Sequence, residues 1–259
     1  MTGQVYDLAT KRPVGPPVPR ARYAGPYDAH FLTPDGSMLA LLVRDEKEYK
    51  EVRCRVLEVA TGTVVTEVPM PLDPRLTHAR LTPDGSRLVV GLSSYSPAHN
   101  GFRLHVQTWD AKTGAKLGEF APATTGLLAG LAVLDNGRAV FGTGVGELSI
   151  LDLMSGKVER TIDDPERLAC QTLALTPDGK RVAVGQTTRT GAGPHVRLYD
   201  LATGKVSATL GAGALNYSGS QDSNQLSAES VLAFSPDGRR LATRESSSTA
   251  LVWEVPGAE

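Results

Sequence analysis

Six side chains of the types that dominate binding hot spots fall in the longer connections expected between strands. They are aromatic, imidazole or guanidinium groups, and aromatic and arginine side chains contribute most at protein interfaces. The six residues are Tyr49, Tyr95, His99, Arg189, Tyr217 and Arg244. We predict that they contact a protein or peptide partner. For any single one of them, a solvated loop residue without a partner is the alternative.

Patterns that indicate catalysis or metal binding are weak. Histidines 30, 78, 99, 105 and 195 show no His-x-His or His-x-x-x-His spacing, which metal sites often use. Gly142-Thr-Gly-Val-Gly146 is similar to a phosphate-binding loop, but a strand is expected after it, so a tight turn is predicted. The chain has no Gly-x-Ser-x-Gly sequence. We therefore predict no catalytic residue, no metal site and no cofactor.

The two cysteines, Cys54 and Cys170, form no Cys-x-x-Cys pair, which excludes a structural zinc site built from cysteine. We predict two buried thiols in a reducing compartment, and a single long-range disulfide between them remains open.

Composition excludes several classes of protein. The chain has 259 residues, and 27 Lys and Arg against 28 Asp and Glu give a net charge of −1. A nucleic-acid-binding or polybasic membrane surface needs an excess of basic residues. No apolar run reaches the roughly 18–20 residues that cross a bilayer, and no signal peptide is visible. We predict a cytoplasmic protein that binds no nucleic acid and does not insert into a membrane.

The elements that must position these side chains belong to an internal repeat. Short apolar runs flank a Pro-Asp-Gly sequence four times, and a degenerate copy reads Asp-Asn-Gly. Proline presets φ, aspartate bonds its own backbone and glycine accepts a positive φ, so each copy predicts a tight hairpin turn. The turn glycines are Gly36, Gly85, Gly137, Gly179 and Gly238.

A second turn sequence, Thr-Gly or Ser-Gly, follows each of the first four copies and lies between two further strands. Its glycines are Gly62, Gly114, Gly156 and Gly204. Each repeat therefore has four short strands and almost no helix. The shortest repeat, from Gly137 to Gly179, is 42 residues long. Propeller blades have a similar period of about 40–45 residues.

These segments resemble bacterial WD40 repeats, above all Arg197-Leu-Tyr-Asp-Leu-Ala-Thr-Gly204 and Phe234-Ser-Pro-Asp-Gly-Arg-Arg-Leu-Ala242. The resemblance covers nearly the whole chain, although only Trp109-Asp110 has the Trp-Asp pair itself. It implies an all-β fold, a β-propeller of four-stranded antiparallel blades, and a non-catalytic scaffold for protein–protein or peptide binding. Bacterial members are often joined to signalling enzymes such as Ser/Thr protein kinases. Propeller enzymes of quinoprotein or lactonase type share the turn sequences and remain the alternative.

We predict a single propeller domain over residues 1–259 with about five blades. The repeats cover approximately 27–68, 76–120, 128–162, 170–210 and 230–256, and residues 4–19 form two strands of a partial blade. Pro13–Pro19 can supply the outer strand that the last repeat lacks, because one edge of an outer strand is unpaired and tolerates proline. Gln4–Leu8 is then a surplus strand. A part of a larger propeller therefore remains an open interpretation, as does the oligomeric state.

The two ends of the predicted sheets differ. The turn end carries the Asp-Gly turns and the Thr-Gly or Ser-Gly turns. The opposite loop end carries connections of variable length, of which the longer are roughly Arg44–Glu51, Ser93–Arg103, Thr187–Pro194 and Gly211–Ser230. Variable loops on a rigid scaffold often carry binding sites. We therefore predict that the partner binds at the loop end, where the six candidate residues lie.

Overall fold

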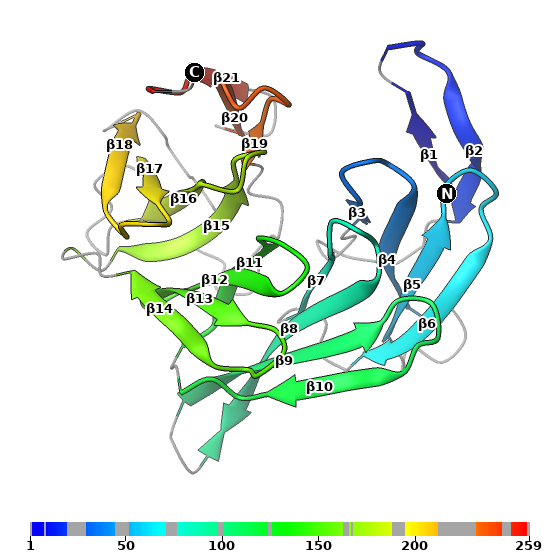
Figure 1. The fold of residues 1–259 in the computed structure, drawn as a ribbon, viewed down its shortest axis with the longest axis horizontal. Coiled ribbons are helices and arrows are strands. Elements are labelled where there is room, and N and C mark those ends of the chain that lie inside the picture. Colours follow the sequence, from blue (N-terminus) through cyan, green and yellow to red (C-terminus); the bar gives the residue numbers. More distant parts are fainter. Residues whose placement is uncertain are drawn as a thin grey trace. The chain divides into compact units, whose positions relative to one another are not determined.

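The structure is a computed structural model that describes the greater part of the chain. The described residues are 2–7, 9–19, 30–44, 52–70, 77–97, 101–123, 126–162, 166, 168–187, 195–211, 232–244 and 250–257. They contain 21 β-strands (Figure 1). Contacts divide the chain into two compact units. Unit 1 is Met1–Leu92 with Val106–Phe120, and unit 2 is Ser93–His105 with Ala121–Glu259.

Unit 1 begins with a two-stranded antiparallel sheet of β1 (Thr2–Tyr6) and β2 (Pro13–Pro19). A four-stranded sheet follows, in chain order: β3 (His30–Leu32), β4 (Met38–Arg44), β5 (Val52–Glu58) and β6 (Val64–Met70). The next sheet has the same order: β7 (Thr77–Leu81), β8 (Arg87–Ser96), β9 (Gly101–Asp110) and β10 (Lys116–Phe120). The tip of its β8–β9 hairpin is grouped with unit 2.

Unit 2 contains two further four-stranded sheets and one three-stranded sheet. The first sheet is β11 (Leu128–Val133), β12 (Arg138–Thr143), β13 (Leu148–Asp152) and β14 (Val158–Ile162). The second is β15 (Ala169–Leu175), β16 (Arg181–Thr187), β17 (His195–Asp200) and β18 (Val206–Leu210). The third is β19 (Leu232–Phe234), β20 (Arg240–Arg244) and β21 (Ala250–Glu254).

The predicted all-β architecture of four-stranded antiparallel sheets is confirmed, and these sheets are consistent with propeller blades. The strand that the prediction used to close a ring, β2, pairs with β1, and β19–β21 form a three-stranded sheet in the described residues. Closure of a ring stays a prediction.

The core consists of apolar side chains packed between successive sheets. In β16, Val182 and Val184 belong to a cluster with β11–β14, whereas Ala183 between them belongs to a cluster with β19–β21. Successive side chains of a strand point to opposite faces of its sheet, so an unbroken apolar run indicates that both faces are buried. This explains the apolar runs in the second strands, such as Leu39–Val43 in β4 and Leu88–Val90 in β8.

The turn chemistry expected from the sequence is present. In the β3–β4 turn the Thr33 hydroxyl donates to Asp35 Oδ1 at 2.6 Å, and the Ser37 N–H donates to the same oxygen at 3.0 Å. Gly36 has a φ of 71° and its N–H donates to the Thr33 carbonyl. This φ is accessible to glycine without a steric penalty. The turns at Asp84, Asp178 and Asp237 repeat these bonds.

Candidate functional site

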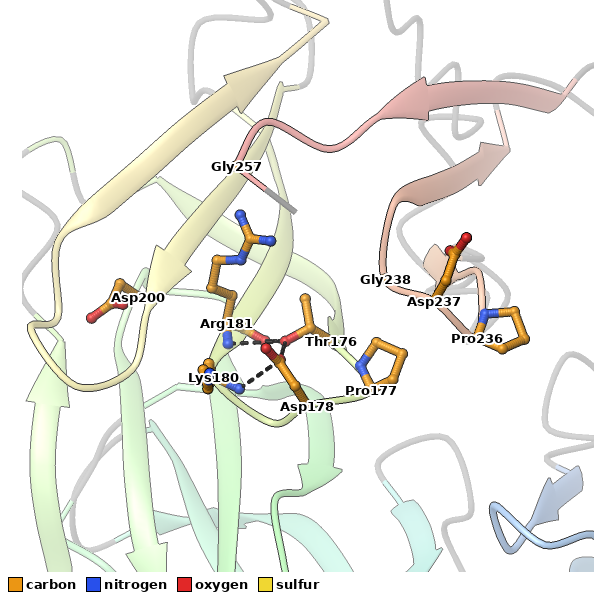
Figure 2. Close-up of a pocket in the computed structure, with 10 residues that line it drawn as sticks. All are labelled: Thr176, Pro177, Asp178, Lys180, Arg181, Asp200, Pro236, Asp237, Gly238 and Gly257. Carbon is orange, nitrogen blue, oxygen red and sulfur yellow. Dashed lines mark hydrogen bonds between the residues drawn. The ribbon is translucent and has the colours of Figure 1, made fainter. Parts of the chain in front are cut away.

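A cavity of about 460 Å³ opens at the turn end of unit 2 (Figure 2). The β15–β16 turn forms one side and the β19–β20 turn another, while the end of β17 and the segment after β21 complete it. Its lining includes five charged side chains. The lining residues are Thr176, Pro177, Asp178, Lys180, Arg181, Asp200, Pro236, Asp237, Gly238 and Gly257.

Packing between the two turns sets the floor of the pocket. Gly238 has a φ of 70°, and a Cβ built on it would lie 3.5 Å from Cδ of Pro177. The two prolines, Pro177 and Pro236, occupy the same position in their respective turns and both line the pocket. A proline has a fixed φ and little side-chain freedom to lose. The two turns therefore present the charged groups on a rigid base.

The carboxylates of Asp178 and Asp237 are held by their own turns. Asp178 Oδ1 accepts hydrogen bonds from the Thr176 hydroxyl at 2.6 Å and from the Lys180 N–H at 3.0 Å. Asp237 Oδ1 accepts from the Ser235 hydroxyl at 2.5 Å and from the Arg239 N–H at 3.0 Å. Within the described part of the chain, each turn uses only Oδ1. The second oxygen of each group is left for a ligand or for water.

The third carboxylate, Asp200, is also held locally. Its Oδ1 accepts from the hydroxyl and the N–H of Thr203, each at 2.7 Å. The bond from the Thr203 hydroxyl is the main cause of a lowered Asp200 pKa. The hydroxyls of Thr176 and Ser235 lower the pKa of Asp178 and of Asp237 in the same way. All three groups are therefore ionised at neutral pH.

Arg181 crosses from one sheet to the next. Its Nη1 donates to the Pro256 carbonyl oxygen at 2.7 Å, just beyond the end of β21. In Figure 2 the Arg181 side chain extends toward Gly257, while Asp200 points away from it. No ion pair joins Arg181 or Lys180 to a carboxylate in the described residues. The pocket thus brings ionised groups of both signs together without pairing them.

This arrangement is suited to binding. A carboxylic acid that donates protons at neutral pH needs a raised pKa, whereas the three carboxyl groups here have lowered values. In the residues that the structure describes, no group of three or more His, Cys, Asp or Glu side chains could hold a metal ion. The pocket can offer charge-assisted hydrogen bonds, which are stronger than bonds between neutral groups.

Four of the six residues predicted to bind a partner lie outside the described residues, namely Tyr49, His99, Arg189 and Tyr217. Arg244 is the last residue of β20. Tyr95, near the end of β8, is 55% exposed, and its ring lies 5.7 Å from the ring of Phe102 at an interplanar angle of 73°. Tyr95 does not line the pocket. Binding through the loop end therefore stays a prediction.

Other motifs from the sequence have structural roles. Of Gly142–Gly146, the first two residues end β12 and the rest lie in the hairpin turn to β13, where the Gly146 N–H donates to the Thr143 carbonyl at 3.0 Å. Cys54 and Cys170 are buried free thiols. Among the described residues, none belongs to a helix long and apolar enough to cross a membrane.

The sequence predicted the turns but missed the pocket that two of them form. The sequence pattern places Asp178 and Asp237 in separate turns, and it does not indicate that the two turns lie next to each other. One signal was available. Asp200 is followed three residues later by Thr203, which captures its carboxylate, whereas Glu254 in the corresponding place is followed by Val255, Pro256 and Gly257. This difference determines whether the arginine on the neighbouring strand, Arg181 or Arg240, has a carboxylate to pair with.

No family model and no curated protein matches the sequence. By contrast, 1334 chains of solved structures match the fold. One of them is Kuenenia stuttgartiensis hydrazine synthase, with a TM-score of 0.58 and 18% sequence identity over 86% of this chain and 57% of that chain. The chain thus spans little more than half the length of that structure. At this identity the likeness shows the fold alone, and a shared fold does not assign an activity.

Proposed function

We propose that the chain is a non-catalytic scaffold of the WD40 kind that binds a protein or peptide partner, and that the pocket of unit 2 is one of its binding surfaces. The observation that carries this proposal is the set of ionised side chains around the pocket that form no ion pair with one another in the described residues, above all Arg181, Asp178 and Asp237. Asp178 and Asp237 are already oriented by their own turns, and Arg181 by the Pro256 carbonyl, so these groups lose little entropy when a partner binds.

The same observation disfavours the alternative of a propeller enzyme. An enzyme of quinoprotein or lactonase type needs groups that transfer protons or hold a cofactor or metal at the reacting atoms. The pocket carboxylates have lowered pKa values, so they are not proton donors at neutral pH. Within the described residues, no group of three or more His, Cys, Asp or Glu side chains could hold a metal ion. A role as the interaction portion of a larger signalling protein is compatible with the scaffold, because the pocket needs no further domain to bind a segment of chain.

The experiment that tests this function compares partner capture by three forms of the chain. In the pocket variant, Asp178→Asn and Arg181→Gln remove one negative and one positive charge. The matched control, Asp84→Asn with Arg87→Gln, makes the same changes at the equivalent turn of β7–β8. Asparagine keeps the oxygen that accepts the turn hydrogen bonds.

Proteins from a lysate of the source cells are captured on each immobilised form and quantified. We expect a partner that is retained by the unaltered chain and by the control but depleted several-fold on the pocket variant. Equal retention on all three forms contradicts a binding role for this pocket.

A further inference from the structure

The first residue of the second strand is an arginine in four of the five larger sheets, namely Arg87, Arg138, Arg181 and Arg240. Arg138 and Arg240 form ion pairs at the surface. Arg138 lies 2.6 Å from an oxygen of Asp135, and Arg240 lies 3.1 Å from an oxygen of Glu254. Arg181 is different, because its hydrogen bond is made to a backbone carbonyl, that of Pro256.

The reason for the difference lies on the neighbouring strand. Arg181 and Arg240 each face an acidic residue across the sheet, Asp200 and Glu254 respectively. Asp200 is turned toward Thr203, which donates two hydrogen bonds to it. Arg181 is consequently left with a carbonyl as its acceptor. A guanidinium has five N–H donors, so most of those on Arg181 remain available to a ligand.

Asp237 provides the opposite charge across the pocket. In Figure 2 its carboxylate rises from the β19–β20 turn toward the same side as the Arg181 guanidinium, and the two come from neighbouring sheets. The turn occupies Oδ1 of Asp237, and Oδ2 accepts no hydrogen bond in the described residues. Both residues line the 460 Å³ cavity, and no ion pair joins the two groups in the described part of the chain.

We propose that the pocket binds a peptide segment carrying both charges, with a carboxylate of the peptide on Arg181 and an ammonium or guanidinium group on Asp237. The inference rests on the proposed binding function and adds the chemical class of the ligand. A planar carboxylate can accept two parallel N–H bonds from a guanidinium. The cationic side chain of the peptide approaches the oxygen of Asp237 that the turn leaves open.

A ligand of one sign fits the pocket less well. A purely acidic peptide meets three carboxylates, at Asp178, Asp200 and Asp237. A purely basic peptide is repelled by Lys180 and Arg181, and covering Arg181 without an acceptor leaves its donors unsatisfied, which is unfavourable. A mixed peptide satisfies both sides. Since both groups border solvent, each contact is of moderate strength and weakens with added salt.

The test uses four fluorescein-labelled octapeptides in anisotropy titrations at low salt. One has alternating Glu and Lys, one has only Lys as its charged residue, one has only Glu, and one has Gln throughout. We expect the mixed peptide to bind the unaltered chain about fivefold or more tighter than each of the others. Raising the salt concentration should remove most of this advantage.

Variants of the chain assign the two contacts. Arg181→Gln should abolish the advantage of the mixed peptide over the Lys peptide, and Asp237→Asn its advantage over the Glu peptide. Arg240→Gln is the matched control, because Arg240 occupies the same turn position, is paired with Glu254 and does not line the pocket. It should leave all four affinities unchanged, and thermal unfolding confirms that each variant is folded.

Equal affinity of all four peptides, or equal loss in Arg181→Gln and Arg240→Gln, overturns the inference. This failure is distinguishable from failure of the proposed function. If partner capture still depends on Asp178 and Arg181 while the mixed peptide shows no preference, the pocket binds a partner of other chemistry. If capture also ignores the pocket, both proposals fail.

Discussion

The guanidinium carbon of Arg80 lies 3.6 Å from the centroid of the Phe31 ring. The two residues hold the same position in successive repeats, two residues before the Thr-Pro of the turn. Arg80 Nη1 donates to the Ala79 carbonyl at 2.8 Å, and burial lowers the pKa of the guanidinium. Arginine stays charged in proteins nevertheless, because its ordinary pKa exceeds 12. The ring face therefore stabilises a half-buried cation.

This pair predicts a measurable coupling energy. Phe31→Leu removes the aromatic face but keeps an apolar side chain, and Arg80→Met removes the charge but keeps the stem. We expect a double-mutant cycle, measured by urea unfolding, to give a coupling of about 0.5–2 kcal/mol. Additive effects of the two substitutions would show that the stacked geometry contributes nothing to stability.

The two tryptophans occupy equivalent places but differ in their hydrogen bonds. Trp253 Nε1 donates to the Thr243 hydroxyl at 2.9 Å, whereas Trp109 Nε1 is buried without a partner in the described residues. The Ala111 N–H bonds the Ser86 carbonyl as the Val255 N–H bonds the Arg239 carbonyl. In the sheet of β20 and β21, Trp253 faces Leu241, and Thr243 lies two residues further along β20 on the same face. Val90 holds the place of Thr243 in β8, since each lies three residues after the first arginine of its strand.

Val90→Thr should therefore supply the missing acceptor and raise the free energy of unfolding by about 0.5–1.5 kcal/mol. The reciprocal change, Thr243→Val, should lower it by about 1–3 kcal/mol because it leaves the Trp253 N–H buried and unsatisfied. Chemical denaturation of both variants tests this. A loss of stability in Val90→Thr comparable to that in Thr243→Val argues against the register-based explanation.

The turn aspartates predict loss of stability in acid. Hydrogen bonds from the Thr33 hydroxyl and then the Ser37 N–H lower the pKa of Asp35 to about 2, from about 3.9 in an unfolded chain. A carboxyl group whose pKa is lower in the folded state than in the unfolded state stabilises the fold fully at pH values above its unfolded-state pKa. This stabilisation is lost as the pH falls through the folded-state pKa. The window is therefore roughly pH 4 to 2.

We expect the melting temperature to be steady from neutral pH to about pH 5 and to fall below about pH 4. The melting temperature of the Asp35→Asn variant should fall less steeply in that window, because the substitution removes one of the titrating groups. Circular dichroism melts at several pH values measure this. A variant whose curve runs parallel to that of the unaltered chain would falsify the role of Asp35.

Close packing of β2 predicts a severe effect of a small substitution. Gly15 has a φ of 68°, and a Cβ at this position would lie 1.8 Å from the Val59 carbonyl oxygen. Gly15→Ala should lower the stability of unit 1 by more than about 2 kcal/mol, since both the backbone conformation and the contact are lost. Gly3→Ala is the control, because a Cβ at Gly3 meets nothing within 4 Å. Similar urea midpoints for the two variants would contradict the close approach of β2 to Val59.

The two thiols predict chemical protection of the native chain. Burial raises the pKa of Cys54 and of Cys170 to about 12, so almost none of either is the reactive thiolate at neutral pH. Cys54 belongs to unit 1 and Cys170 to unit 2. We expect an aromatic disulfide reagent to label each thiol only when its unit unfolds. The Cys170→Ser variant reports the labelling rate of Cys54, and the Cys54→Ser variant reports that of Cys170. Immediate labelling of the folded protein contradicts this burial.

The repeated turns could be predicted from the sequence because each depends on residues within a few positions of one another. The hydrogen bond between Thr33 and Asp35 and the positive φ of Gly36 arise within this short segment and do not depend on distant parts of the chain. The alternation of Val182, Ala183 and Val184 between two clusters follows in the same way from an apolar strand with two buried faces.

The pocket could not be predicted in this manner. Arg181 and Arg240 have the same local sequence, Asp-Gly-x-Arg, yet one bonds the Pro256 carbonyl and the other pairs with Glu254. Their difference depends on how Thr203 holds Asp200 and on where the chain passes after β21. Both are properties of tertiary packing, which a repeat pattern does not contain.

Within each unit, a turn glycine packs on the turn of the preceding sheet, as Gly85 does on Met38, Gly179 on Leu134 and Gly238 on Pro177. These three sheets thus pack on the preceding sheet of their unit through the same type of contact. Stability of this form is a sum over nearest neighbours, like that of a one-dimensional lattice. Duplication or deletion of one complete repeat keeps this type of packing contact between successive sheets. Such a chain can therefore change its length in evolution by whole repeats while its turn sequences stay the same.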